Sequence, residues 1–144
     1  MAALDLSSPA LELSFLPTPL SVIQLKPSQA IPSKLLQALT GAGDAHSFVS
    51  ITRCPDEISI ILPASQFEEL YPPTSLGPWT TLKVAGPMDL SLTGILNELT
   101  GPLKTAQVPI FASSTWNTDY VLIEERHKEA ARAALEQAGW KFAP

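Results

Sequence analysis

Apolar residues recur along the chain at two spacings, one typical of strands and one typical of helices. Short runs rich in β-branched residues, bounded by Pro, Gly, Ser or Asp, predict strands at about 20–26, 47–53, 57–62, 79–85, 107–113 and 119–125. Apolar residues three or four positions apart predict helices at about 32–40, 89–100 and 126–138. Gly139 is well placed to end the last helix, and residues 140–142 then form a short final strand.

The first half of the chain fits this scheme less well than the second. Residues 65–70 predict only a short helical turn. No strand is expected between residues 70 and 79, because the prolines there cannot donate to a strand ladder. The alternating segment from Leu11 to Leu16 is left over, and we expect this N-terminal strand to fill an edge place in one of the sheets.

The two halves repeat each other weakly. An alignment that places Phe48 on Phe111 brings five identical pairs together: Phe48/Phe111, Ser50/Ser113, Thr52/Thr115, Asp56/Asp119 and Ile60/Ile123. Upstream, an alignment that places Pro27 on Pro87 superposes two helical stripes, Leu35, Leu36 and Leu39 on Ile95, Leu96 and Leu99. The predicted fold is therefore α+β, with two ferredoxin-like βαββαβ units in tandem, each an antiparallel sheet with helices on one face. We assign residues 1–10 to an N-terminal tail, 11–77 to the first unit and 78–144 to the second.

Composition narrows the class of protein. With 45% hydrophobic and 16% charged residues, the chain is expected to fold rather than to be disordered. No apolar run reaches the roughly 18 residues of a membrane span. The net charge of −5 and the scattered cations argue against nucleic-acid binding. The start of the chain lacks the features of a secretory signal, and Cys54 is the single cysteine, so we expect a cytoplasmic protein.

The sequence offers little for catalysis. His46 and His127 are not in a metal-ligand spacing, and no known nucleophile or phosphate-binding motif is present. Asp56 and Glu57 are adjacent on a predicted strand, so their side chains point to opposite faces. We therefore expect no enzyme activity, no metal and no cofactor. An enzyme that uses Cys54 or His127 is the weakest of the alternatives.

Three segments in order resemble a known family. They are residues 48–60 (FVSITRCPDEISI), 86–96 (GPMDLSLTGIL) and 114–122 (STWNTDYVL). Together they look like a small tandem ACT-domain protein, similar to one half of the cytosolic arginine sensors and more distantly to aspartate kinase regulatory domains. The resemblance covers about residues 13–142. It implies a non-catalytic module, because ACT domains pair side by side and commonly bind amino acids at the interface between them.

The loop after the predicted strand 79–85 is the first candidate binding element. Its candidate residues are Gly86, Pro87, Met88, Asp89 and Ser91. Glycine permits close backbone approach, and a helix N-terminus offers unpaired N–H groups that suit a carboxylate. The resemblance adds that the corresponding loop contacts the ligand in the arginine sensors. The alternative is that Pro87 and Asp89 only start a helix.

The second candidate element is the tip of the last hairpin, with Ser114, Thr115, Trp116 and Asp119. Asp119 can receive an ammonium group, and Trp116 can cover an apolar or cationic side chain. The resemblance implies ligand binding at the matching Thr, aromatic and Asp positions. The alternative is ordinary turn chemistry. In the alignment of Phe48 with Phe111, Arg53 replaces the aromatic residue, so no equivalent pocket is expected in the first half.

These observations predict a regulatory protein that binds an amino acid or a similar small ligand between ACT domains. Since the arginine sensors carry four ACT units and this chain has two, the resemblance implies a homodimer in which the loop of one chain faces the hairpin of another. The alternative function is a protein-interaction module that keeps the ACT fold without a small-molecule ligand. The sequence does not select the amino acid or the regulated partner.

Overall fold

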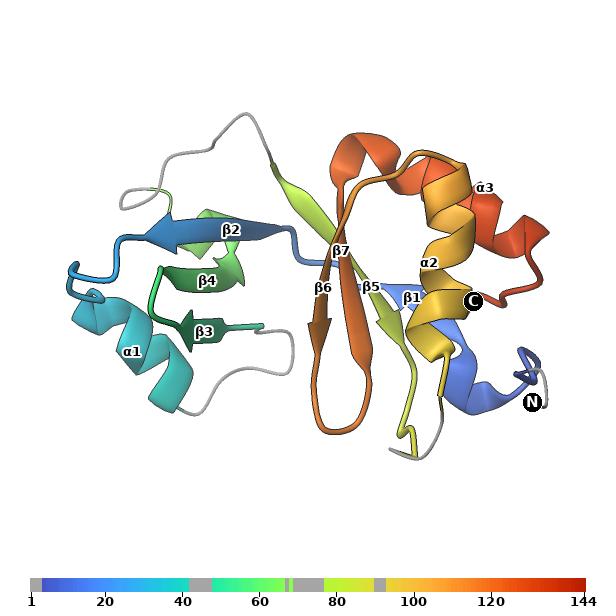
Figure 1. Cartoon of the computed structure of the whole chain (residues 1–144), viewed down its shortest axis with the longest axis horizontal. Coiled ribbons are helices and arrows are strands. Elements are labelled where there is room, and N and C mark those ends of the chain that lie inside the picture. The colour runs from blue at the N-terminus through green and yellow to red at the C-terminus, as the bar shows by residue number, and fades with distance from the viewer. Residues whose placement is uncertain (1–3, 42–47, 67, 69–76, 90–92) are drawn as a thin grey trace. The chain divides into compact units, whose positions relative to one another are not determined.

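The computed structural model describes residues 4–41, 48–66, 68, 77–89 and 93–144, and its fold mixes α-helices with antiparallel strands (Figure 1). Contacts divide the chain into two compact units. One combines Met1–Leu16 with Thr80–Pro144, and we call it the split unit; the other is Pro17–Trp79, the continuous unit. In the described part of the chain, no helix is both long enough and apolar enough to cross a bilayer.

The split unit contains a sheet with the strand order β1–β5–β7–β6. Its elements are β1 (Leu13–Phe15), β5 (Trp79–Val84), α2 (Ile95–Thr105), β6 (Ile110–Ser114), β7 (Asp119–Glu124) and α3 (Lys128–Gln137). Short 3-10 turns precede β1 and α3, at Pro9–Leu11 and Glu125–His127. The predicted hairpin is confirmed as β6–β7, and α2 and α3 pack on the same side of the sheet (Figure 1).

The N-terminal strand belongs to this sheet. Leu13 pairs with Val84 of β5 and forms a parallel bridge with Phe142. Two backbone hydrogen bonds of 2.8 Å, from Leu13 to Lys141 and from Ala143 to Leu13, tie it to the end of the chain. The predicted final strand is thus reduced to one bridge, and β1 lies between two neighbours instead of at an edge. Residues 11–16 group with the second half of the chain, in contrast to the division expected from the sequence.

One apolar core holds the split unit together. It takes alternate residues from the strands and every fourth residue from α2, as the two side-chain periods require. Its members include Leu13, Leu82, Val84, Ile95, Leu99, Leu103, Val121, Ile123, Leu135 and Trp140. α2 begins six residues later than predicted. It continues past Pro102, because Leu103 is buried in this core and holds the last turn in place.

The continuous unit is an antiparallel sheet of order β3–β4–β2 with one α-helix among its described residues. Its elements are β2 (Leu20–Leu25), α1 (Ser33–Thr40), β3 (Ser50–Arg53) and β4 (Ile58–Pro63), followed by a 3-10 turn at Ala64–Gln66. Leu35 of α1 packs on Leu25, Ile58, Ile60 and Leu62. Half of the helical turn predicted at 65–70, and most of the loop up to residue 79, lie outside the described residues.

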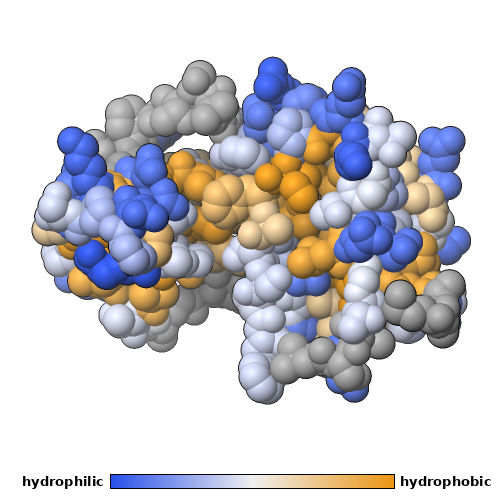
Figure 2. All heavy atoms as spheres, viewed as in Figure 1, coloured by the Kyte–Doolittle hydropathy of each residue, from blue (hydrophilic) through white to orange (hydrophobic). Residues whose placement is uncertain are grey.

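The predicted apolar stripe of the first helix is only partly correct. Leu35 is fully buried, whereas Leu36 and Leu39 are 43% and 47% exposed. Apolar surface is visible over α1 in Figure 2. In the split unit α2 packs against α3. The described residues of the continuous unit contain no second α-helix that could cover the flank of α1 in the same way.

The internal repeat is present in the hairpins, but the alignment of Phe48 with Phe111 is wrong by two positions. At the tip of the β3–β4 hairpin the Cys54 N–H donates to the Glu57 carbonyl at 3.0 Å. At the tip of the β6–β7 hairpin the Thr115 N–H donates to the Thr118 carbonyl at 2.9 Å. The Cys54 thiol and the Thr115 hydroxyl repeat these contacts at 3.4 and 3.3 Å. Cys54 therefore matches Thr115. Asp119 corresponds to Ile58, not Asp56, and Arg53 corresponds to Ser114, not Trp116.

Replacement of Leu13 by Ala tests the place of the N-terminal strand. Since Leu13 is fully buried in the core of the split unit, Leu13→Ala is expected to lower its free energy of unfolding by about 2–5 kcal/mol. The measurement is urea unfolding followed by the fluorescence of buried Trp140, with Trp79 and Trp116 replaced by Phe. The exposed Leu36→Ala variant is the control, with an expected change below about 0.5 kcal/mol. Similar losses in both variants would contradict the assignment.

Candidate functional site

The two predicted binding elements meet at one end of the split unit's sheet. One is the loop between β5 and α2, and the other is the tip of the β6–β7 hairpin. They meet because β5 and β7 are neighbours in the sheet and β7 begins beside the end of β5, where the Thr118 hydroxyl donates to the Val84 carbonyl. Both elements come from the same chain, so no second copy is needed to bring them together.

The loop is held against the hairpin tip at Gly86. The Met88 N–H donates to the Asn117 carbonyl at 2.7 Å. Gly86 has φ +67°, and a Cβ placed there would lie 2.9 Å from the Asn117 carbonyl oxygen and 3.1 Å from the Thr118 Cβ. Only glycine fits this backbone conformation and this separation without displacing a neighbour. The cis bond to Pro87 follows directly.

The N-terminal segment supports the same loop from its other side. The Ala85 N–H donates to the Glu12 carbonyl at 2.8 Å, and the Gly86 N–H donates to the Ala10 carbonyl at 2.9 Å. These contacts join segments from opposite halves of the sequence and were not expected from it. The alternation of Leu11 and Leu13 indicated a strand, but nothing in that pattern selected β5 as its partner.

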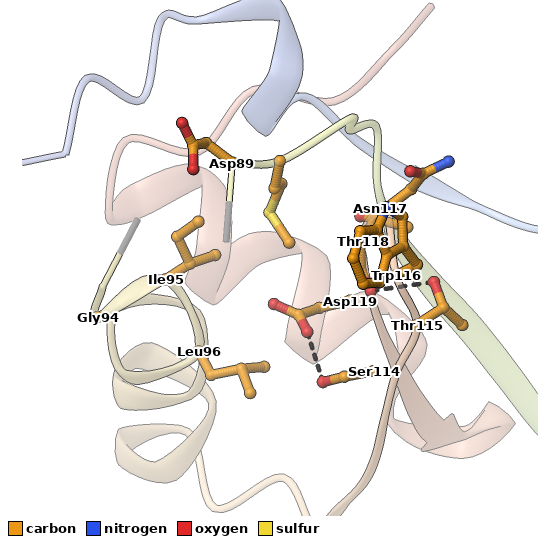
Figure 3. Close-up of a pocket in the computed structure, with 11 residues that line it drawn as sticks. Asp89, Gly94, Ile95, Leu96, Ser114, Thr115, Trp116, Asn117, Thr118 and Asp119 are labelled. Atoms are coloured by element: carbon orange, nitrogen blue, oxygen red, sulfur yellow. Dashed lines mark hydrogen bonds between the residues drawn. The ribbon is translucent and has the colours of Figure 1, made fainter. Parts of the chain in front are cut away.

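A cavity of about 300 Å³ opens between the loop, the hairpin tip and the first turn of α2 (Figure 3). It is lined by Met88, Asp89, Gly94, Ile95, Leu96, Ser114, Thr115, Trp116, Asn117, Thr118 and Asp119. Six of the nine candidate residues therefore line one cavity, while Gly86 and Pro87 shape the loop behind it. Ser91 lies outside the described residues.

The sequence does not predict that the start of α2 lines this cavity. The sequence pattern predicts that the helix begins at residue 89, whereas α2 begins at Ile95. The overlooked signal is Gly94, which has φ +79° and immediately precedes the helix. With the start at Ile95, the first turn of α2 faces the hairpin, and the first N–H groups of that turn have no acceptor within the helix.

Asp119 is the buried charge of the site. It is the first residue of β7, and its side chain lies on the helix side of the sheet, as do those of Val121 and Ile123 farther along the strand. Only 7% of the residue is exposed, and its Oδ1 accepts a 2.6 Å hydrogen bond from the Ser114 hydroxyl. Figure 3 shows the carboxylate directed into the cavity toward the start of α2, whose positive end stabilises a negative charge.

The ionised side chains of the described lining are all negative. They are Asp89 and Asp119, and the residues that the structure places around the cavity include no Lys, Arg or His. Figure 3 shows the Asp89 carboxylate at the rim, directed away from Asp119. Trp116 stands on the hairpin side and is 80% exposed. The arrangement offers hydrogen-bond acceptors, a buried negative charge and an aromatic surface, which together suit a small ligand with a donor or cationic end.

The described residues do not assemble a metal site. No three His, Cys, Asp or Glu side chains among them are placed to hold an ion. Cys54 lies in the other unit, at the tip of the β3–β4 hairpin, where its thiol donates to the Glu57 carbonyl.

Comparison with known proteins identifies relatives of the whole chain. Residues 75–137 match the family model of the ACT domain. Protein Atu0741 from Agobacterium tumefaciens is 30% identical, with 94% of each chain covered and a TM-score of 0.73. No curated protein gives a significant match.

Two more distant structures share the fold. The structure of aspartokinase alpha and beta subunits is 19% identical, with a TM-score of 0.62 over 93% of this chain and 97% of that one. The ligand-free regulatory subunit of aspartate kinase from Thermus thermophilus is 17% identical, with a TM-score of 0.59 over 89% and 97%.

Substitution of Gly86 tests the contact between loop and hairpin. Gly86→Ala is expected to lower the free energy of unfolding by more than about 2 kcal/mol, since it adds a steric clash to the strain of a positive φ. Gly94→Ala is the matched control. It has a similar φ but nothing within 4 Å of the new Cβ, so a loss of only about 1–2 kcal/mol is expected. Equal losses in urea unfolding would show that the close approach contributes nothing.

Proposed function

Residues 75–137 of the chain match the ACT-domain family, and on that premise we propose that the protein is a non-catalytic regulatory protein that binds an amino acid or a close chemical relative. The observation that carries the proposal is the buried Asp119 carboxylate, directed into a cavity formed by two loops that are fixed to each other. A negative charge buried in a cavity whose described lining holds no cationic side chain is suited to a ligand that brings the positive charge with it.

The proposed binding mode follows the chemistry of the lining. Asp119 accepts the α-ammonium group of the ligand, with Ser114 and Thr115 as neighbouring hydroxyls. The α-carboxylate lies at the N–H groups of the loop and of the first turn of α2, where the helix dipole favours an anion. Trp116 covers the ligand's side chain. Gly86 and Pro87 act behind the cavity by keeping the loop in place.

The regulatory role is supported by the family and by the architecture. The relative with 30% identity is matched along 94% of both chains, so it spans the two compact units and not only the part matched by the family model. We propose that both units are ACT-like and that the described residues of the continuous unit form no ligand pocket of their own. The similarity to a regulatory subunit of aspartate kinase favours an output through binding rather than through chemistry.

Pairing of two copies completes the proposal. ACT domains associate side by side, and the exposed Trp116 beside the cavity is suited to be covered by a second copy. A ligand that binds the paired state more tightly than the single chain shifts the population toward the pair. A cytoplasmic partner that distinguishes the two states then receives the signal.

A second function is favoured by the exposed leucines of α1. Leu36 and Leu39 lie on one flank of that helix, and a large part of each remains accessible to solvent. In a protein-interaction module, this flank binds a partner and the cavity has no small-molecule ligand. Such a module gives no thermal response to metabolites, which separates it from the first proposal.

A thermal-unfolding screen against the twenty amino acids and related amines tests the proposal. A ligand present at a hundred times its Kd raises the free energy of unfolding by about 2.7 kcal/mol. Asp119→Asn is expected to weaken binding of the hit at least about tenfold, because it removes the charge and keeps an acceptor for Ser114. Asp56→Asn, at the exposed tip of the other hairpin, is the matched control and is expected to bind like the wild type. A flat screen would instead favour the interaction module.

A further inference from the structure

The segment before β1 runs from the end of α3 to the loop that forms one wall of the cavity. We call residues 4–12 the strap; in Figure 1 it is the blue segment that leads into β1. Near its start Leu6 lies beside Gly139, where an added Cβ would be 3.6 Å from the Leu6 Cδ1. Leu6 is half-buried against the apolar core of the split unit, and Leu11 is buried within that core.

The strap and the hairpin tip hold the loop from two different sides. The N–H groups of Ala85 and Gly86 donate to the strap, at the carbonyls of Glu12 and Ala10. Because proline follows Gly86, the next N–H of the loop belongs to Met88, and it donates to the hairpin tip instead. One side of the loop therefore depends on a segment that lies far earlier in the sequence.

Local contacts allow the strap to move as one piece. The Ser8 N–H donates to the Asp5 carbonyl, and the Leu11 N–H donates to the Ser8 carbonyl, both at 3.0 Å. Leu11 stands between Ala10 and Glu12, so the burial of its side chain restrains both of the carbonyls that bind the loop. The apolar anchors of the strap thus set the position of the two acceptors.

The continuous unit satisfies the corresponding N–H from within its own loop. Each unit has a proline in the loop between a strand and a helix, Pro27 after β2 and Pro87 after β5. The N–H before Pro27 belongs to Lys26 and donates to the Gln29 side chain at 2.7 Å. The N–H before Pro87 belongs to Gly86 and donates to the strap at 2.9 Å. A local contact in one unit is therefore replaced in the other by a contact with a remote segment.

We infer that the strap and the loop after β5 open together, as one cooperative unit, while the rest of the split unit stays folded. Release of the strap removes both acceptors from one side of the loop, and the contact of Met88 with the hairpin is lost with them. The cavity then loses the wall that contains Met88 and Asp89. Segments held by few apolar contacts open in this way without global unfolding.

The inference rests on the proposed function for its ligand and adds a means of regulating that site. A ligand that binds only when the loop is in place favours the docked strap. By the same coupling, any partner that binds the released strap lowers the affinity of the cavity for its ligand. The strap is thus a positioning element that touches no ligand itself.

Hydrogen exchange at single amides, measured by NMR without added ligand, tests whether strap and loop open together. Leu6→Ala removes a half-buried anchor at the start of the strap. The N–H groups of Leu11, Gly86 and Met88 are expected to exchange at least about tenfold faster in this variant. Met88 decides the matter, because its acceptor belongs to the hairpin and not to the strap. The Lys26 N–H is the internal control and is expected to keep its rate.

Leu135→Ala is the matched control variant. Leu135 is fully buried in the same core but lies on α3, so its truncation destabilises the whole unit. Exchange is then expected to rise in the ladder of β6 and β7 as much as in the loop. Leu11→Ala repeats the test at the buried anchor of the strap.

Two results with the strap variants would overturn the inference. In the first, exchange at Met88 stays unchanged in both Leu6→Ala and Leu11→Ala, which means that the loop keeps its place without the strap. In the second, both variants speed exchange in β6 and β7 as strongly as in the loop, which means that the loop opens only when the unit unfolds.

An added probe separates the inference from the proposed function. The probe is an equimolar mixture of the twenty amino acids, and in the wild type it is expected to slow exchange at Leu11 and Met88 alike, by at least about threefold. If the mixture slows exchange at Met88 and not at Leu11, the function stands and the inference is overturned. If it changes no amide, the proposed function fails, and the strap variants alone decide whether strap and loop open together.

Discussion

The close approach of Gly86 to the hairpin tip is the constraint on which the site depends. It places the loop after β5 within hydrogen-bond distance of Asn117, and Thr118 closes the contact by donating to the end of β5. A side chain at Gly86 would separate the loop from the hairpin. The cavity lies between this fixed point and Gly94, the residue that precedes α2.

The same fixed point connects the site to the N-terminal segment. The carbonyls of Ala10 and Glu12 hold the N–H groups of Gly86 and Ala85, and the following strand continues into the core through Leu13. The loop is therefore restrained on both sides by backbone hydrogen bonds, which do not depend on side-chain identity. A cavity built this way can keep its shape when the side chains of its lining change.

The sequence predicted the elements of the fold better than their arrangement. Short-range patterns located both hairpins and Asp119, because alternation and turn residues act over a few positions. The pairing of Leu13 with Val84 depends on contacts across the whole chain, which no local pattern encodes. The alignment of Phe48 with Phe111 differs from the hydrogen-bond register by two positions, because identical polar residues at the tips, such as Asp56 and Asp119, do not occupy equivalent places. The hidden correspondence of Arg53 with Ser114 follows from that register alone.

The hairpin tips of the two units differ at the pair of residues that face each other where the two strands meet the turn. In the continuous unit the Arg53 side chain donates a hydrogen bond of 3.1 Å to the Pro27 carbonyl in the loop between β2 and α1. Ile58, which is paired with Arg53, packs in the apolar core of that unit. In the split unit Ser114 and Asp119 take these two places, and the Asp119 carboxylate is buried and accepts a hydrogen bond from the Ser114 hydroxyl. The buried carboxylate, and not the shared hairpin, therefore distinguishes the tip of the split unit from that of the continuous unit.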